Sequence, residues 1–139
     1  MSTAVKIATD VRNDANDAGM NNVDDGSAAG YIEIRTGSQP ANCAAAATGT
    51  LLATNVGSDP FFGASSGGTK TAAAISDDTS ADATGTAGWW GLYDSNGSRK
   101  MQGDCGEAGD SPSMVFNNKN ITAGNVVKIT SFTVTMPET

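Results

Sequence analysis

The clearest alternation of hydrophobic and polar positions lies near the C-terminal end of the chain. β-Branched and aromatic residues fill residues 121–136, a Gly-Asn turn signal lies near the start of this segment, and Pro137 follows it. This composition suits a half-buried strand. Its large apolar residues form two sets of opposite parity, Val127 and Ile129 and then Phe132, Val134 and Met136. A regular strand would send the two sets to opposite faces. Either a bulge near residues 130–131 restores one face, or the strand is covered on both sides.

Shorter segments of the same kind occur before it. Tyr31 to Arg35 alternates strictly, so Ile32 and Ile34 share one face. Asn96-Gly97 is a strong hairpin signal because both residues tolerate positive φ, and it predicts that 88–93 and 99–103 pair as neighbouring strands. Further strands are expected at 49–56, 70–75 and 114–116, with turn-rich loops at 77–83 and 106–111.

The N-terminal segment has helical rather than strand periodicity. Its apolar residues recur every three or four positions, which predicts a narrow stripe on a helix over about 4–18. These residues are Ala4, Ile7, Ala8, Val11, Ala15 and Ala18. The stripe is mostly alanine, so we expect a short helix or an arm that orders only when the segment lies on the sheet or on a neighbouring subunit.

Six to eight short strands separated by turn signals favour an all-β fold. We therefore predict an antiparallel β-sandwich, jelly-roll-like, over residues 30–139, preceded by an arm or helix at residues 1–29. With 139 residues, the chain is long enough for one domain with a real core.

The charge and composition of the chain argue against nucleic-acid and membrane partners. The net charge is −7, and the eight Lys and Arg residues are scattered except for Arg99-Lys100. Nucleic-acid binding needs clustered basic residues, so no nucleic-acid partner is expected. No apolar run is long enough to cross a bilayer and no secretory signal is recognisable, which predicts a soluble protein made in the cytoplasm, with no membrane partner.

The two cysteines, Cys43 and Cys105, are too few for a zinc framework. They are either two buried thiols or one bridge between loops at the same end of the fold.

The sequence contains few residue patterns that would support catalysis. The chain has no histidine, which removes the common Ser-His-Asp and Cys-His arrangements, including any built on Ser111. Residues 63–70 have glycines at Walker spacing, but the order Thr69-Lys70 is reversed, so a flexible loop is the better interpretation. Acidic residues in 14–25 and at Asp77, Asp78 and Asp82 match no calcium loop. No enzyme activity, cofactor or resident metal is expected.

Aromatic pairs are the remaining candidates for binding. Trp89 and Trp90 alternate across a strand, so one should enter the core and the other should face outward or lie under a loop. An outward ring would stack on a sugar or contact a subunit. Of Phe61 and Phe62, one is expected to face the core.

Four segments together resemble a family of small proteins of tailed bacteriophages and prophages, some of them called virion structural proteins. These segments are GYIEIRTGSQP at 30–40, AATGTLLAT at 46–54, DPFFGA at 59–64 and ITAGNVVKITSFTVT at 121–135. They are strand and turn signatures that cover most of the chain after Gly30. The resemblance implies a structural role in the virion, and by analogy with other small, acidic, β-rich virion proteins a capsid cement or decoration protein.

That expectation names a partner, a location and contact residues. The partner is the phage major capsid protein and the location is the capsid exterior. A homo-oligomer is expected, and a trimer would suit closed symmetry. The candidate subunit or capsid contacts are Val5, Ile7, Val11, Phe61, Phe62, Trp89 and Trp90. A tail, baseplate or fibre component is an alternative, and a carbohydrate-binding module using Trp89 or Trp90 is another.

Overall fold

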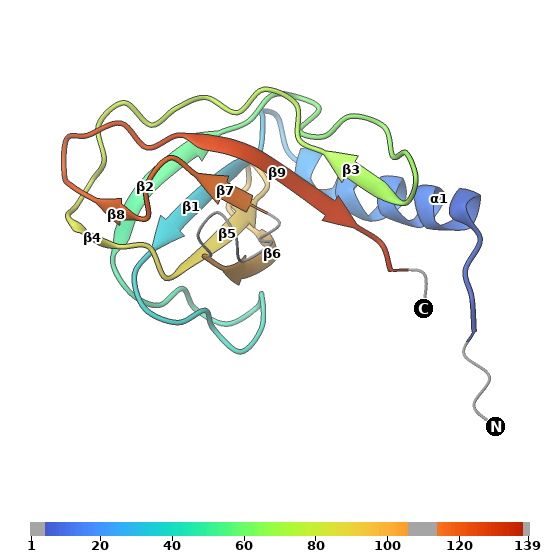
Figure 1. Cartoon of the computed structure of the whole chain (residues 1–139), viewed down its shortest axis with the longest axis horizontal. Helices are drawn as coiled ribbons and strands as arrows, with labels where there is room; N and C mark the ends of the chain where they lie inside the picture. The colour runs from blue at the N-terminus through green and yellow to red at the C-terminus, as the bar shows by residue number, and fades with distance from the viewer. Residues whose placement is uncertain (1–4, 106–113, 138–139) are drawn as a thin grey trace.

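The computed structural model describes residues 5–105 and 114–137 (Figure 1). Within them the chain forms one α-helix, one 3-10 helix and nine strands, and every strand pair is antiparallel. This confirms the antiparallel, β-rich fold and the short N-terminal helix. The elements are α1 (Thr9–Met20), η1 (Asn21–Asp24), β1 (Tyr31–Arg35), β2 (Leu51–Val56), β3 (Thr69–Thr71), β4 (Gly85–Thr86), β5 (Trp89–Tyr93), β6 (Arg99–Asp104), β7 (Met114–Phe116), β8 (Asn120–Ile121) and β9 (Ile129–Thr135).

The larger sheet has the order β2-β1-β5-β6. Ile32 and Ile34 of β1 are fully buried on its inner face, as the alternation predicts. The predicted hairpin joins β5 to β6. In its turn the Asp94 carboxylate accepts hydrogen bonds from the amides of Asn96 (3.0 Å) and Ser98 (2.9 Å), and Gly97 has φ of 85°. The local sequence therefore fixes both the turn and the register of this pair.

The smaller sheet has the order β3-β9-β7, and its central strand contains the predicted bulge. Val115 pairs with Ser131 and Phe116 pairs with Ile129, so Thr130 is the extra residue on β9. Thr130 is exposed, while Ile129 and Phe132 on either side are buried. The bulge restores one apolar face, which resolves the change of parity in the sequence.

Aromatic side chains join the two sheets. Trp90 of β5 meets Phe132 of β9 edge to face, with ring centroids 5.1 Å apart. Phe61 and Phe62 stand 5.0 Å from each other, and Phe62 stands 5.5 Å from Phe132. Both phenylalanines are buried, although the sequence predicted only one in the core, because the chain before β3 bends so that both rings enter the same cluster.

The free edge of β2 is covered by the loop at 76–82. The amides of Ser76 and Asp82 donate to the carbonyls of Val56 and Leu52, each at 2.8 Å. The Asp78 carboxylate accepts from the amide of Thr54 at 2.9 Å. One of the three clustered aspartates is therefore a structural acceptor. A covered edge cannot pair with another strand.

The pattern missed the short pair β4-β8. These strands have only two residues each, so they carry no periodicity that could be recognised. The predicted loop over 106–111 and the candidate nucleophile Ser111 lie outside the described residues.

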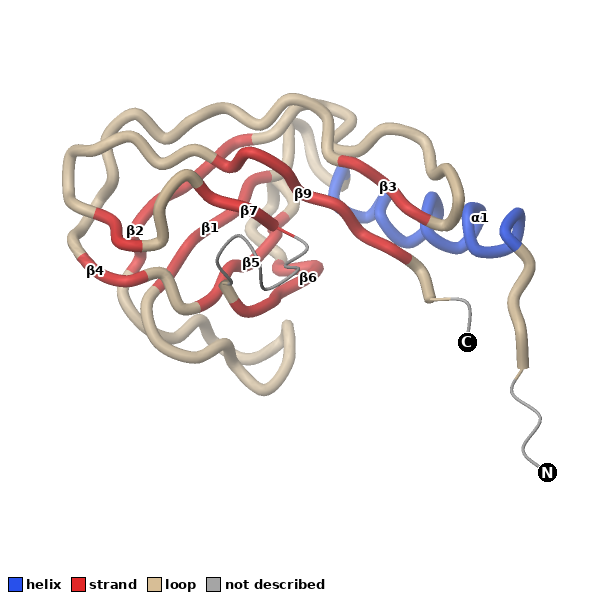
Figure 2. The backbone as a smooth tube through the Cα atoms, in the orientation of Figure 1, coloured by secondary structure: helices blue, strands red, loops and turns tan. Residues whose placement is uncertain are grey.

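The N-terminal segment is fixed to the β-sheets. Helix α1 begins at Thr9, after non-helical residues 5–8, rather than near residue 4. Val23 in η1 is fully buried, and the Asp24 carboxylate accepts the amide of Phe61 at 2.8 Å. Figure 2 shows α1 beside β3, away from the larger sheet, where the C-terminal part of β9 extends beyond β7.

Candidate functional site

Helix α1 docks on the β-sheets with its polar side. Its buried and half-buried residues are Arg12, Asn13, Asn16, Asp17 and Met20. The predicted apolar stripe faces the other way, since Ala8, Val11, Ala15 and Ala18 are all exposed. The segment therefore lies on the sheets, one of the two expected arrangements, but it does so with its polar side and not with the apolar stripe.

The reason is the turn that precedes β3. Asn13 accepts the amide of Gly68 at 2.8 Å, and Asp17 accepts the amide of Ser65 at 3.0 Å. Asn16, 1% exposed, donates to the carbonyls of Gly68 (3.3 Å) and Val134 (3.1 Å). The loop that resembled a phosphate-binding motif is thus held by three helix side chains.

Two cations complete the attachment. Arg12 donates to the carbonyls of Met136 (3.0 Å) and Gly67 (3.4 Å). The buried ammonium of Lys70 lies 2.7 Å from the Asp17 carboxylate. Hydrogen bonds from Lys70 and Ser65 lower the pKa of Asp17 to about 2. The helix is therefore positioned by directed polar contacts, and its apolar side is left without a partner within the described chain.

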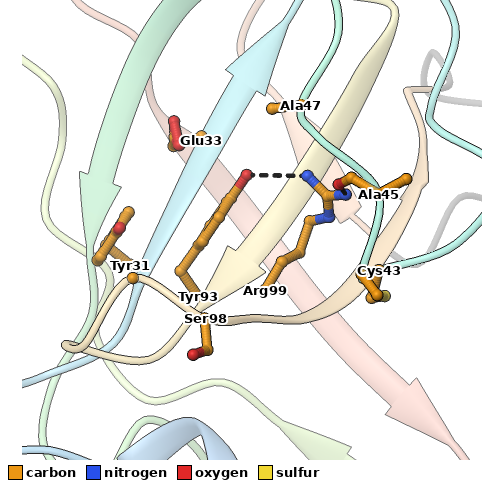
Figure 3. A pocket seen from close by; sticks show the side chains of 10 residues that line it. Tyr31, Glu33, Cys43, Ala45, Ala47, Tyr93, Ser98 and Arg99 are labelled. Carbon is orange, nitrogen blue, oxygen red and sulfur yellow. Dashed lines mark hydrogen bonds between the residues drawn. The ribbon is translucent and has the colours of Figure 1, made fainter.

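A second candidate region is a cavity of about 660 Å³ on the outer face of the larger sheet (Figure 3). The loop between β1 and β2 folds over this face. Outward side chains of the sheet hold it through backbone carbonyls: Gln102 donates to Pro40 (2.6 Å), Trp89 to Thr48 (3.3 Å) and Arg35 to Gly49 (3.3 Å). The cavity lies between this loop and the β5-β6 hairpin.

Arg99 forms one wall of the cavity. Its guanidinium lies over the rings of Trp89 (5.2 Å) and Tyr93 (5.9 Å). Nη1 donates to the Tyr93 hydroxyl at 3.2 Å, and Nη2 donates to the carbonyls of Asn42 and Ala45. Gly91 makes this possible, because a Cβ there would lie 2.9 Å from Cδ of Arg99.

Two stacked tyrosines continue the lining beside Arg99. Tyr31 and Tyr93 are paired across β1 and β5, with ring centroids 5.2 Å apart and planes 1° from parallel. Burial, with the nearby Glu33 and Tyr93, raises the pKa of Tyr31, so its hydroxyl stays protonated at neutral pH. Glu33 lines the same cavity and pairs with Arg35 at 3.1 Å.

The two tryptophans lie as the alternation predicted. Trp90 enters the core, and Trp89 lies on the opposite face under Arg99 and the β1-β2 loop. Both are buried, at 5% and 0% exposure, so neither ring is available for a sugar or a subunit.

The other candidate subunit or capsid contacts divide into buried and exposed residues. Phe61 and Phe62 are core residues and cannot reach a partner in this conformation. Val5 and Val11 are 79% and 55% exposed, and Ile7 is half-buried. The exposed valines are the ones that remain available as contacts.

Both cysteines are free thiols, so the considered bridge is not formed here. Cys43 lies in the loop that lines the cavity. Cys105 follows β6, and burial raises the pKa of its thiol to about 12, which leaves it unreactive at neutral pH.

The sequence reasoning missed the cavity residues Tyr31, Tyr93 and Arg99. A partial signal existed, since Tyr31 occupies an outward position of the alternating strand and Tyr93 and Arg99 flank the Asn-Gly turn. What the sequence did not contain is the path of the loop that closes over them.

The findings below concern residues 5–105 and 114–137. No group of three or more His, Cys, Asp or Glu side chains there could hold a metal ion. No helix in residues 5–105 and 114–137 is long and apolar enough to cross a membrane.

Comparisons of the chain with protein-family models, curated proteins and solved structures find no match.

Proposed function

We propose that this protein is a non-enzymatic structural protein of a tailed-phage virion, which attaches to the outside of the capsid and reinforces the shell. Its partner in this proposal is the major capsid protein. Copies would occupy symmetry-related positions, for which a trimer at three-fold axes is a suitable arrangement. Many repeated contacts would add up across the shell, so each need be only weak.

The observation that carries the proposal is the orientation of α1. Its polar side attaches it to the turn before β3, and its apolar side, Ala8, Val11, Ala15 and Ala18, is exposed, as is Val5 in the segment that precedes the helix. A helix normally buries its apolar stripe. This helix is held in place by its polar side, so its apolar stripe is left exposed for contact with a partner protein.

Two further features support the same role. The strand and turn segments at 30–40 and 121–135 resemble phage virion proteins. The two antiparallel sheets share one core through Trp90 and Phe132, which we interpret as the two layers of a jelly-roll-like sandwich. A compact, acidic, two-layer domain with a projecting helix is suited to binding a shell without binding the DNA inside it.

The copy number of the chain in purified virions is the first test. Quantitative mass spectrometry should give a ratio to the major capsid protein near one or near a simple fraction of it. A handful of copies per particle would instead favour a tail or baseplate position. Absence from the virion would overturn the proposal.

A substitution on α1 tests the contact surface. Val11→Asp places a charge on the outward stripe and should abolish rebinding to capsids that lack this protein, with little change in folding stability. Val126→Asp is the matched control, because Val126 is 50% exposed and lies in the loop between β8 and β9, which Figure 1 shows at the opposite end of the molecule from α1. Capsids carrying the Val126→Asp protein should resist heat as well as complete ones. Equal rebinding by both variants would show that α1 is not the contact.

A further inference from the structure

The cavity is lined by a cation, Arg99, that pairs with no carboxylate among the described residues. Among the described residues, Arg35 pairs with Glu33, Lys70 pairs with Asp17, and Lys100 lies near Asp25 and Asp94. Arg99 has no carboxylate within 4.0 Å in the same set, although the whole chain carries a net charge of −7. A guanidinium kept apart from acidic groups at a cavity wall attracts an anion.

The guanidinium is also held in place before any ligand arrives. It lies over two aromatic rings, and three of its N–H groups are engaged by Tyr93, Asn42 and Ala45. A guanidinium has five N–H groups. Nε is buried and out of reach of a ligand, so the donor left for one is the N–H of Nη1 that no described residue engages. A fixed cation with a spare donor loses little entropy on binding.

The rest of the lining suits a ligand that carries hydroxyl groups. The Tyr31 hydroxyl makes no hydrogen bond to any described residue, and Ser98 adds a second hydroxyl at the rim. One oxygen of Glu33 is paired with Arg35, which leaves the other free to accept. Ala44, Ala45 and Ala47 contribute small apolar contacts. The volume of about 660 Å³ lies within the ~300–1,000 Å³ of small-molecule sites.

From this combination, we propose that the cavity binds an acidic sugar of the hexuronic acid class. The sugar carboxylate would meet Arg99, and its ring hydroxyls would meet Glu33 and Tyr31. A neutral sugar would leave Arg99 without a counter-ion. A simple carboxylate would leave Glu33 without a donor, and a phosphate dianion would be repelled by Glu33 and by the net charge. This site is independent of the outward side of α1, so it stands or falls separately from the capsid role.

The direct test is an NMR titration of the full chain with galacturonate, and with glucose, acetate and inorganic phosphate as comparison ligands. Galacturonate should shift the amide signals of the loop at 43–47 and of the turn at 97–99, and the shifts should saturate at millimolar sugar. The three comparison ligands should bind at least about tenfold more weakly, since each lacks one of the matched contacts.

Two variants and one control assign the contacts. Arg99→Lys keeps the charge but loses the fork geometry, and should weaken galacturonate binding by about tenfold or more. Tyr31→Phe removes only a hydroxyl and should weaken binding about threefold or more. If Arg99→Lys disturbs the packing over Trp89, the Tyr31→Phe variant still tests whether galacturonate binds in the cavity. Arg12→Lys makes the same change on α1, outside the cavity, and should leave the affinity unchanged.

Several results would overturn the assignment. One is the absence of any saturable shift of amide signals with galacturonate. Another is binding of glucose, acetate or phosphate as tight as that of galacturonate. A third is an unchanged affinity for galacturonate in Tyr31→Phe. Shifts that saturate but map to residues far from the cavity would overturn it as well.

Discussion

In the two-sheet region, the residues that join the layers are aromatic and enclosed, whereas at the helix-bearing end the joining residues are polar. Trp90 and Phe132 meet inside the fold with 5% and 1% exposure. Asn16 and Asp17 instead reach backbone groups and Lys70 across the surface of a turn. Figure 1 shows the two regions connected by the long strand β9, which runs through both.

The two regions differ in what their contacts contribute: hydrophobic contacts mainly add stability, and hydrogen bonds mainly determine orientation. Hydrophobic burial is non-directional and large, so it supplies most of the stability of the two-sheet region. Hydrogen bonds to specific carbonyls contribute less but allow one orientation only. They fix which side of α1 faces the protein, and so they also decide that the apolar side faces away from it.

The largest expected effect is the loss of a core ring. Phe132→Ala removes the side chain that contacts Phe61, Phe62 and Trp90, and should lower the free energy of unfolding by about 3–5 kcal/mol. Urea unfolding followed by tryptophan fluorescence would measure it. Val126→Ala, at a surface turn, should change it by less than about 0.5 kcal/mol. A similar small loss in Phe132→Ala would mean that the two sheets are not joined through this ring.

A smaller and more local effect is expected at Asn16. Asn16→Ala removes the two hydrogen bonds from the buried side-chain amide to the carbonyls of Gly68 and Val134, which costs about 1–3 kcal/mol. Hydrogen exchange should accelerate in α1 and β3 while β1 and β5 keep their protection. Asp14→Ala, at an exposed position of the same helix, is the control. Equal exchange in both variants would show that Asn16 does not hold the helix.

The sequence predicted the parts of the fold that depend on local pattern. The parity change before Phe132 predicted either a bulge near 130–131 or a strand covered on both sides, and the structure has the bulge, at Thr130. Asn96-Gly97 required a hairpin, and β5 pairs with β6 through it. In both cases the determining residues are neighbours in the chain, so periodicity and turn chemistry are sufficient.

The parts that were missed depend on contacts with backbone atoms far along the chain. Apolar periodicity on α1 predicted the wrong docked side, because alanines offer little area to bury and Asn13, Asn16 and Asp17 meet the turn at 65–68 instead. Likewise, Gln102 and Arg99 hold the loop over the cavity through carbonyls. Every residue has a carbonyl, so such partners leave no mark in a sequence.

The smallest expected effect is a pH dependence of the attachment of α1 that the two-sheet region does not share. Hydrogen bonds from Lys70 and Ser65 lower the pKa of Asp17 from 3.8 to about 2. Because the folded-state pKa is depressed, this carboxylate stabilises the attachment fully above about pH 4, and the contribution is lost as the pH falls towards 2. Hydrogen exchange of α1 should therefore accelerate over that window before β1 and β5 lose protection. Asp17→Asn should remove much of this dependence, while Asp14→Asn makes the same charge change on the same helix and should retain it. If the wild-type helix kept its protection down to pH 2, or lost it together with the sheets, the polar attachment would not be the weaker of the two.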